Sequence, residues 1–312
     1  MATELKIHLA SEDELAAAHR NVFDIWSKGL PLEDHVRSRL NSPSHSRAAW
    51  FVGCLAGRVV VSLGCYPLTF RLDGKLLPGI AIGSVYTLGE FRGQGFAGNL
   101  LEWVENHERE RGAALSVLYS DIEPGYYARR GYALCPSWAG WLDPCDAEPT
   151  PTHGHRLVAV SAREHLPRLA KFYADYHGAT PLSVARDEDY WQAILKKFAD
   201  DTFYALQGAS GTWSGYVRVG SKEGTWRITD FALADQSTEL AQQLYAALLS
   251  LAAAGGAERV GGWLPDSPAA RKFFELEPRG VEITMVRPLR ADVSLSDEAI
   301  ASTSRFCEID HV

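Results

Sequence analysis

Three glycines within six residues, Gly93, Gly95 and Gly98, join an expected strand to an expected helix. The strand is the apolar run KLLPGIAIGSVYTL (75–88). One face of the helix that follows is marked by apolar residues at helical spacing: Phe96, Leu100, Leu101 and Val104. A helix N-terminus presents free N–H groups and the positive end of the helix dipole, and glycines let a ligand approach the backbone. The segment therefore predicts an α/β fold with an anion site between strand and helix.

The three glycines also fit the GxGxxG pattern of dinucleotide-binding folds, with Asp121 at the end of the next strand. In those folds the first glycine directly follows a buried parallel strand, whereas GEFR (89–92) intervenes in this chain. The preceding strand is also expected in an antiparallel hairpin, because Asp73-Gly74 between two apolar runs is a strong turn signal. A Walker A loop is excluded, since no Gly-Lys-Ser/Thr follows. The pattern thus favours a different phosphate-bearing ligand.

The two halves of the chain show a similar order of elements. Each begins with a strand that runs into a capping box, Ser11 to Glu14 in the first half and Ser161 to Glu164 in the second. Two helices, three antiparallel strands, a helix, a strand, a short helix and a last strand are expected to follow in each half. We predict an α/β (α+β) fold of two tandem domains, each with a mixed, largely antiparallel sheet flanked by helices. A Pro-rich boundary lies near residues 143–155. The predicted ranges are 1–145, 146–290 and a C-terminal tail, 291–312.

Composition narrows the classes of function. The 312-residue chain has a net charge of -8 and a pI near 5.7, which argues against nucleic-acid binding. Its N-terminus lacks the pattern of a signal peptide, and no apolar run is long enough to span a bilayer, so a cytoplasmic protein without a membrane partner is expected. The five cysteines show no metal-ligand spacing, and no metal is expected.

Arg92, Gly95 and Ala97 spell RxxGxA. The segment GSVYTLGEFRGQGFAGNLL (83–101) resembles the acyl-CoA-binding motif of the GNAT family of N-acetyltransferases, whose strand, RxxGxG/A loop and helix hold the pyrophosphate of coenzyme A. The resemblance implies acetyl-CoA as acyl-donor cosubstrate and an opening between the strand end and LSVLYS (115–120), where the open backbone pairs with the pantetheine arm. The cofactor-binding residues that it implies are Val85, Tyr86, Thr87, Arg92, Gly93, Gln94, Gly95, Phe96, Ala97 and Gly98.

A second motif, GYYARRGY (125–132), resembles the FYxxxGF signature of the same family, in which the second aromatic is a tyrosine beside the thioester sulfur. Tyr127 matches that position and is the expected catalytic residue, and Tyr126 is expected to pack. A phenol with a pKa of ~10 can donate a proton to the departing thiolate, whose conjugate acid has a pKa near ~8.5.

The second half lacks both motifs. No Arg-Gly-x-Gly lies between TWRITDFAL (225–233) and the next helix, and Phe274 stands where Tyr127 stands in the first half. We therefore expect a degenerate second domain, whose aromatic residues are mostly core. Such a pair of domains is similar to the aminoglycoside-acetylating enhanced intracellular survival proteins, although a third, sterol-carrier-like domain and their hexameric assembly are not carried over. The first domain is also similar to the fungal lysine N6-acetyltransferases.

The resemblance implies an acetyl-CoA-dependent N-acetyltransferase that acts on a primary amine of a small molecule such as an amino acid, a polyamine or an amine antibiotic. A non-catalytic acyl-CoA-binding module and a protein lysine acetyltransferase remain alternatives, and a homo-oligomer is left open. Attack by an amine needs a proton acceptor, and several residues are candidates: Glu90, Asp121, His19, His35 and Asp24. The apolar spacing of SRFCEIDHV (304–312) suggests that the tail docks on the first domain and presents Asp310, His311 or a terminal carboxylate to the acceptor.

Overall fold

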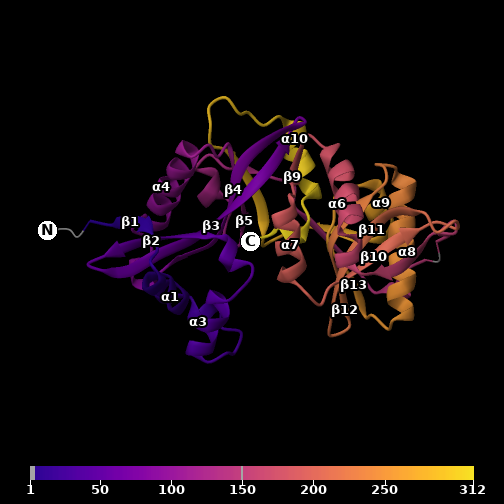
Figure 1. Ribbon diagram of the computed structural model, residues 1–312, viewed down its shortest axis with the longest axis horizontal. Coiled ribbons are helices and arrows are strands. Elements are labelled where there is room, and N and C mark those ends of the chain that lie inside the picture. The colour runs from indigo at the N-terminus through magenta and orange to yellow at the C-terminus, as the bar shows by residue number, and fades with distance from the viewer. Residues whose placement is uncertain (1–3, 149) are drawn as a thin grey trace.

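The computed structural model describes residues 4–148 and 150–312 and contains two twisted sheets, one in each half of the chain (Figure 1). No helix among these residues is long and apolar enough to cross a membrane. The C-terminus lies between the two halves, as Figure 1 shows.

The first sheet is antiparallel except where β4 runs parallel to β5. Its strands lie in the order β1 (Lys6–Leu9), β2 (Ala49–Leu55), β3 (Arg58–Leu72), β4 (Lys75–Thr87), β5 (Leu115–Ser120), β15 (Ile283–Pro288) and β6 (Ala133–Leu134), and β9 (Leu182–Ala185) pairs with the end of β3. Its helices are α1 (Glu12–Asn21), α2 (Phe23–Trp26), α3 (Leu32–Leu40), α4 (Phe96–Glu110) and α5 (Gly125–Ala128), with short turns η1 (His45–Arg47) and η2 (Gly89–Phe91).

The second sheet repeats the plan, with one parallel pair, β12 and β13. Its order is β14 (Glu275–Pro278), β7 (Trp138–Leu142), β13 (Arg259–Trp263), β12 (Thr225–Leu233), β11 (Trp213–Lys222), β10 (Thr202–Gln207) and β8 (Arg156–Val160). The remaining elements are α6 (Ala162–Gly178), α7 (Glu188–Lys197), α8 (Thr238–Ala254), α9 (Pro268–Phe273), α10 (Asp297–Ser302) and the turns η3 (Pro144–Asp146), η4 (Thr303–Arg305) and η5 (Glu308–Asp310).

The two sheets exchange a strand, which differs from the expectation that each half completes its own sheet. β7 joins the second sheet beside β13, and β15 joins the first between β5 and β6. β15 suits this central position because Met285 faces one hydrophobic cluster and Val286 faces the other, so both of its faces are buried. The boundaries at residues 145 and 290 stay predictions; each exchanged strand lies just before one of them and pairs with the sheet of the other domain.

The local turn and cap signals have the expected structures. Asp73 and Gly74 both have positive φ, 47° and 79°, as a two-residue hairpin turn requires. Ser11 and Glu14 form a complete capping box. At the second predicted box only half is present, the Glu164 N–H donating to the Ser161 hydroxyl.

The core continues from one half of the chain into the other. On β3, Leu63 and Cys65 point toward α4, a side that we name the α4 face. Tyr66 and Leu68 point the opposite way and join a cluster that extends through the second half as far as α8; we name this side the interdomain face. The two halves therefore share one apolar core, and any site on the interdomain face has walls from both.

Candidate functional site

The parallel strands β4 and β5 separate partway along their length. They pair from Gly79 with Leu115 to Ile82 with Leu118, and beyond that point β4 stays paired only with β3. The ladder with β3 shifts register near Ser84, which has a positive φ of 52°. Such a bulge kinks the strand and turns it away from its neighbour. The edge of residues 83–87 that faces β5 is thus left open, as expected for Val85, Tyr86 and Thr87.

The glycine segment opens the helix that follows. Gly93 and Gly95 have φ of 77° and 83°, in the left-handed region that favours glycine, and Gly95 is the residue that precedes α4. The first helical N–H with a partner in the helix is that of Asn99, which donates to the Gly95 carbonyl. The N–H groups of residues 96–98 precede it and have no acceptor within α4. This end of α4 is therefore a backbone site for an anion.

Arg92 and Gln94 are held by backbone carbonyls. Arg92 Nε donates to the Thr87 carbonyl at 3.1 Å, and its guanidinium lies 5.5 Å from the centre of the Tyr86 ring. Gln94 Nε2 donates to the Glu90 carbonyl at 3.3 Å. Arg92 thereby spans the two predicted segments, the open strand end and the glycine loop.

Gly98 has a different role from the other two glycines. It is buried, and a β-carbon at residue 98 would collide with the guanidinium of Arg130. Arg130 also donates to the Tyr126 carbonyl at 2.8 Å and lies 3.9 Å from the Tyr126 ring centre. Gly98 thus lets the α5 segment pack closely against the first turn of α4.

Tyr127 lies on α5 at the α4 face. Its side chain is buried, and burial raises the pKa of its phenol to about 12. The ring packs edge-on against Tyr126, with centroids 5.0 Å apart, and against Tyr132 at 5.9 Å. A phenol with this pKa stays protonated at neutral pH and can act only as a proton donor.

These parts line one groove with a cavity volume of about 730 Å³, a size typical of small-molecule sites. Most of the predicted residues lie on its wall: Val85, Tyr86, Thr87, Arg92, Gly93, Gly95, Phe96, Ala97 and Tyr127. Gln94 and Gly98 do not. The wall also contains residues that we did not predict: Ile25, Trp26, Ser84, Tyr119 and Ile122. The groove therefore passes through the open strands, from Tyr127 at the α4 face to Tyr119 at the interdomain face.

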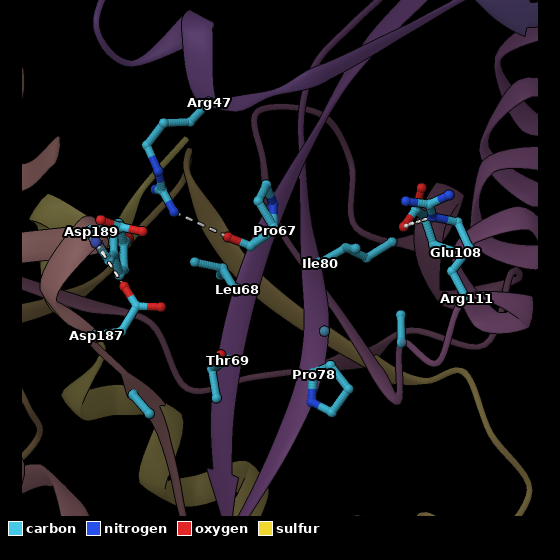
Figure 2. A pocket seen from close by; sticks show the side chains of 14 residues that line it. Arg47, Pro67, Leu68, Thr69, Pro78, Ile80, Glu108, Arg111, Asp187 and Asp189 are labelled. Atoms are coloured by element: carbon cyan, nitrogen blue, oxygen red, sulfur yellow. Dashed lines mark hydrogen bonds and ion pairs between the residues drawn. The ribbon is translucent and has the colours of Figure 1, made fainter.

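Another hollow, of about 850 Å³, lies along β3 and β4 and is drawn in Figure 2. Arg47, Asp187 and Asp189 lie on one side of these strands and Glu108 and Arg111 on the other, as Figure 2 shows. Glu108 and Arg111 belong to the C-terminal end of α4, where the helix dipole is negative and disfavours phosphate. The predicted cofactor residues are not on its wall, so this hollow is a poor candidate for the same ligand.

The candidate proton acceptors are spread over the first domain. Asp121 lines the groove, and its carboxylate accepts the Glu282 N–H at 3.1 Å. Glu90 is exposed and pairs with Arg58 at 2.7 Å. His19 on α1 and His35 on α3 are buried, with His35 Nε2 3.1 Å from the His19 carbonyl, and Asp24 is exposed. Of this set, the structure brings Asp121 alone to the groove wall.

The tail folds back between the two halves. A β-carbon at Gly83 would lie 3.1 Å from the carbonyl oxygen of Val312, so the tail reaches the point where β4 and β5 separate. The His311 ring packs edge-on against Tyr119, and burial lowers its pKa to about 3. Asp310 is fully buried in an ion pair with Arg186. Neither side chain is suited to accept a proton from an ammonium group.

In the second half, side chains or the tail occupy the places that correspond to the open helix N-terminus, the strand opening and Tyr127. The N-terminus of α8 is capped by the hydroxyl of Ser237, which accepts the Leu240 N–H. β12 and β13 part after Ile228 and Gly262, and a small cavity beyond this point is lined by Asp230, Phe231, Trp263 and the tail residues 304–308. Phe274 packs on Tyr245 in the core. The tail thus sits in the part of the second domain that is an open groove in the first.

In the first domain, two parallel strands separate beside a helix N-terminus that is not capped by a side chain and that follows a glycine turn. This arrangement is typical of an acyl-CoA-dependent acyltransferase fold. The fold is present here as two tandem copies. The comparisons agree with this class. Residues 7–135 match the family model described as an acetyltransferase (GNAT) domain. No curated protein sequence matches the chain.

Solved structures share the tandem fold over most of the chain. A probable N-acyltransferase from Enterococcus faecalis V583 superposes with a TM-score of 0.71 at 16% identity, covering 92% of this chain and 73% of that one. Eis1 from Mycobacterium abscessus gives 0.60 at 19%, covering 93% and 74%. A tandem GNAT protein from the clavulanic acid biosynthesis pathway gives 0.56 at 14%, covering 93% and 100%. The family match thus lies within the first domain, and the solved structures show that the fold extends over the second.

Proposed function

We propose that this protein is an acetyl-CoA-dependent N-acetyltransferase that acetylates a primary amine of a small molecule. The observation that carries the proposal is the junction of two open backbone surfaces, the edge of residues 83–87 and the N-terminus of α4, in one groove that ends at Tyr127.

The donor fits this groove by its chemistry. The amide groups of its pantetheine arm match the unpaired strand edge at Val85, Tyr86 and Thr87. The pyrophosphate matches the N–H groups of residues 96–98 and the charge of Arg92. Gly93 and Gly95 have no protein atom within 4 Å of the place where a β-carbon would stand, so the loop leaves room for a phosphate.

The transfer itself is a direct displacement. The neutral amine attacks the thioester carbonyl, a C–N bond forms, the C–S bond breaks, and the amine loses one proton. The departing thiolate takes a proton from the Tyr127 phenol, and the phenolate takes up a proton from solvent before the next turnover. Positioned general acids typically accelerate such a reaction by roughly a hundredfold to ten-thousandfold. The proton of the amine passes to solvent or to Asp121, the carboxylate on the groove wall.

A small acceptor is favoured over a protein chain because the interdomain end of the groove is enclosed. Tyr119 packs there against Trp263 of the second domain and against His311 of the tail. Val312 lies against Gly83 on the same side. An extended polypeptide would need an open channel where these three elements meet.

The second domain is proposed to shape this end of the groove and not to bind a second acyl-CoA. Its helix end is capped by Ser237 and its strand opening holds the tail. A cytoplasmic location is proposed on the cysteines: all five lie in the described part of the chain and are free, which suits a reducing compartment.

The test is release of free thiol from acetyl-CoA against a panel of amines: amino acids, polyamines, aminoglycosides and a lysine peptide. We expect turnover with at least one small amine and little with the peptide. An acetyl-CoA-dependent rise in melting temperature without turnover on any amine would contradict the enzyme and favour an acyl-CoA-binding module.

A further inference from the structure

Arg39 on α3 reaches the groove from the side opposite Tyr127. Its Nη2 lies 3.5 Å from the hydroxyl of Ser84, the bulge residue where β4 and β5 separate. Its guanidinium carbon lies 5.0 Å from the centre of the Trp26 ring. Both Ser84 and Trp26 line the groove, whereas Arg39 does not, so the half-buried guanidinium stands directly behind these two wall residues, next to the open strands.

The charge of Arg39 is not balanced by the protein. Within residues 4–148 and 150–312 it forms no ion pair, although the chain as a whole carries a net charge of -8. Its Nε donates to His19 Nδ1 at 3.3 Å. His19 is neutral, because burial, and then the charge of Arg39, lower its pKa to about 3. The Nη1 and Nη2 edge of the guanidinium has one long contact, to Ser84.

Two other cations share neighbours with Arg39: Arg47 also acts on Tyr66, and Lys197 also acts on His45. Arg47, from the turn that follows α3, donates to the Pro67 carbonyl at 3.3 Å, as Figure 2 shows, and stacks on the Tyr190 ring at 4.2 Å. Lys197 is half-buried and donates to the Ile309 carbonyl at 2.9 Å. Neither cation forms an ion pair with a carboxylate within 4 Å in the part of the chain described. A half-buried guanidinium without a counter-ion is costly unless a ligand neutralises it.

The phosphates of acetyl-CoA are not placed to neutralise Arg39. They are expected at the N-terminus of α4, and α4 packs on Leu63 and Cys65 at the α4 face. Arg39 instead lies near Tyr66, on the interdomain face, close enough to that phenol to lower its pKa against the larger effect of burial. The missing anion must therefore come with the acceptor.

We infer that the acceptor is an amine that carries a carboxylate, as an amino acid does, and that Arg39 binds this carboxylate at the interdomain end of the groove. The inference rests on the proposed N-acetyltransferase function and names its substrate class. One guanidinium edge pairs bidentately with one carboxylate. A polyamine or an aminoglycoside, by contrast, would bring further positive charge against Arg39 and is disfavoured.

The test compares matched amines on the full-length protein: phenylalanine with phenethylamine, lysine with cadaverine, and glucosamine with glucosamine 6-phosphate. We expect kcat/KM for the carboxylate member to exceed that of its decarboxylated partner by about 10- to 100-fold, the range that a charged hydrogen-bonded pair supplies. Arg39→Gln should remove most of this ratio through KM. Arg37→Gln on the same helix, an exposed residue paired with Asp34, is the matched control and should keep it.

A second readout does not need turnover. Calorimetry with saturating coenzyme A measures binding of each amine to the wild type and to Arg39→Gln, and an unchanged acetyl-CoA affinity confirms that the variant is folded. Carboxylate-selective binding that Arg39→Gln abolishes supports the inference even if no acetyl transfer occurs, an outcome that contradicts only the proposed function. Turnover without carboxylate preference, or a preference for the phosphate or the decarboxylated amine, overturns the inference and leaves the N-acetyltransferase standing.

Discussion

Arg186 Nη2 lies 2.8 Å from Asp310 Oδ2, and neither side chain is exposed to solvent. The same guanidinium pairs with Asp230 on β12 at 2.7 Å. Arg186 follows β9, which pairs with β3 of the first sheet. This buried cation therefore connects the tail, the second sheet and a strand at the edge of the first sheet. The position of Val312 at the strand opening therefore depends on this pair.

Replacing Asp310 by Asn tests that dependence. Removing one partner of a buried ion pair typically costs about 3–5 kcal/mol, and because Asp230 still neutralises Arg186 we expect about 3 kcal/mol from denaturant unfolding. Turnover should fall while acetyl-CoA binding persists, since the donor groove lies on the first domain. Asp292→Asn, which breaks an exposed pair with Arg290, is the control and should change stability by less than about 1 kcal/mol. Full turnover in Asp310→Asn would show that the tail has no part in the reaction.

The sequence contained the local signals of this architecture but not the partners of its strands. The Asp73-Gly74 turn, the Ser11 capping box and the start of α4 follow from neighbouring residues and were predicted correctly. The destinations of β7 and β15 were not, because an apolar five- or six-residue strand fits any central position in a sheet. Pairing between residues some 160 positions apart, such as Ile283 with Ser120, depends on the packing of the whole chain.

Gly95→Ala tests the glycine turn before α4. Gly95 has a φ of 83° with no atom within 4 Å of its β-carbon position, so alanine costs strain of about 1–2 kcal/mol but makes no clash in the free protein. Acetyl-CoA should lose more than about tenfold in affinity by calorimetry, because the methyl group occupies the phosphate site.

Gly29→Ala is the matched control for this strain. Gly29 has a φ of 81°, is equally free of neighbours, and lies in the exposed loop between α2 and α3. The Gly29→Ala variant should lose as much stability as Gly95→Ala and keep the wild-type affinity for acetyl-CoA. Equal affinity losses in both variants would mean that backbone strain, and not contact with the ligand, weakens binding.

Tyr127→Phe tests the proton donor. We expect kcat to fall by about a hundredfold to a thousandfold with the Kd for acetyl-CoA unchanged, because the ring still packs against Tyr126 and Tyr132. Since burial raises the Tyr127 pKa to about 12, the wild-type rate should show no alkaline decline below about pH 10. Tyr126→Phe is the control and should keep kcat within about threefold. An alkaline limb near neutral pH, or full activity in Tyr127→Phe, would assign the proton to another group.

The motif residues of the groove could be expected from the sequence because they lie within 14 consecutive positions, Val85 to Gly98. Of the proposed acceptor end, only the tail was expected, since the rest is assembled from α2, α3 and β5. Arg39 in particular is one of three arginines between residues 37 and 47, and nothing local distinguishes it from Arg37, which is exposed and paired. Only the bulge at Ser84 and the position of Trp26 single it out.

The pH dependence of stability follows from four histidines, of which His19 and His177 are buried and His45 and His311 are half-buried. Burial lowers the pKa of His19 and His311 to about 3 and of His45 and His177 to about 4, against an ordinary value of 6.5. The unfolded chain therefore takes up these protons as the pH falls below 6.5 while the folded protein does not, so the stability present above pH 6.5 is lost toward pH 3–4. Glu308 acts in the opposite direction, because burial raises its pKa to about 7 and the folded form binds its proton first.

For these five groups alone the net difference is about three protons near pH 5.5, which corresponds to a loss of roughly 4 kcal/mol in unfolding free energy per pH unit. Urea titrations between pH 7.5 and 5 measure this slope. His177→Gln should reduce it by about one proton, since His177 is fully buried with Nε2 3.0 Å from the Phe231 carbonyl. His153→Gln, in an exposed turn, should leave it unchanged. A slope below one proton in the wild type would mean that the folded protein opens around these histidines and lets them protonate.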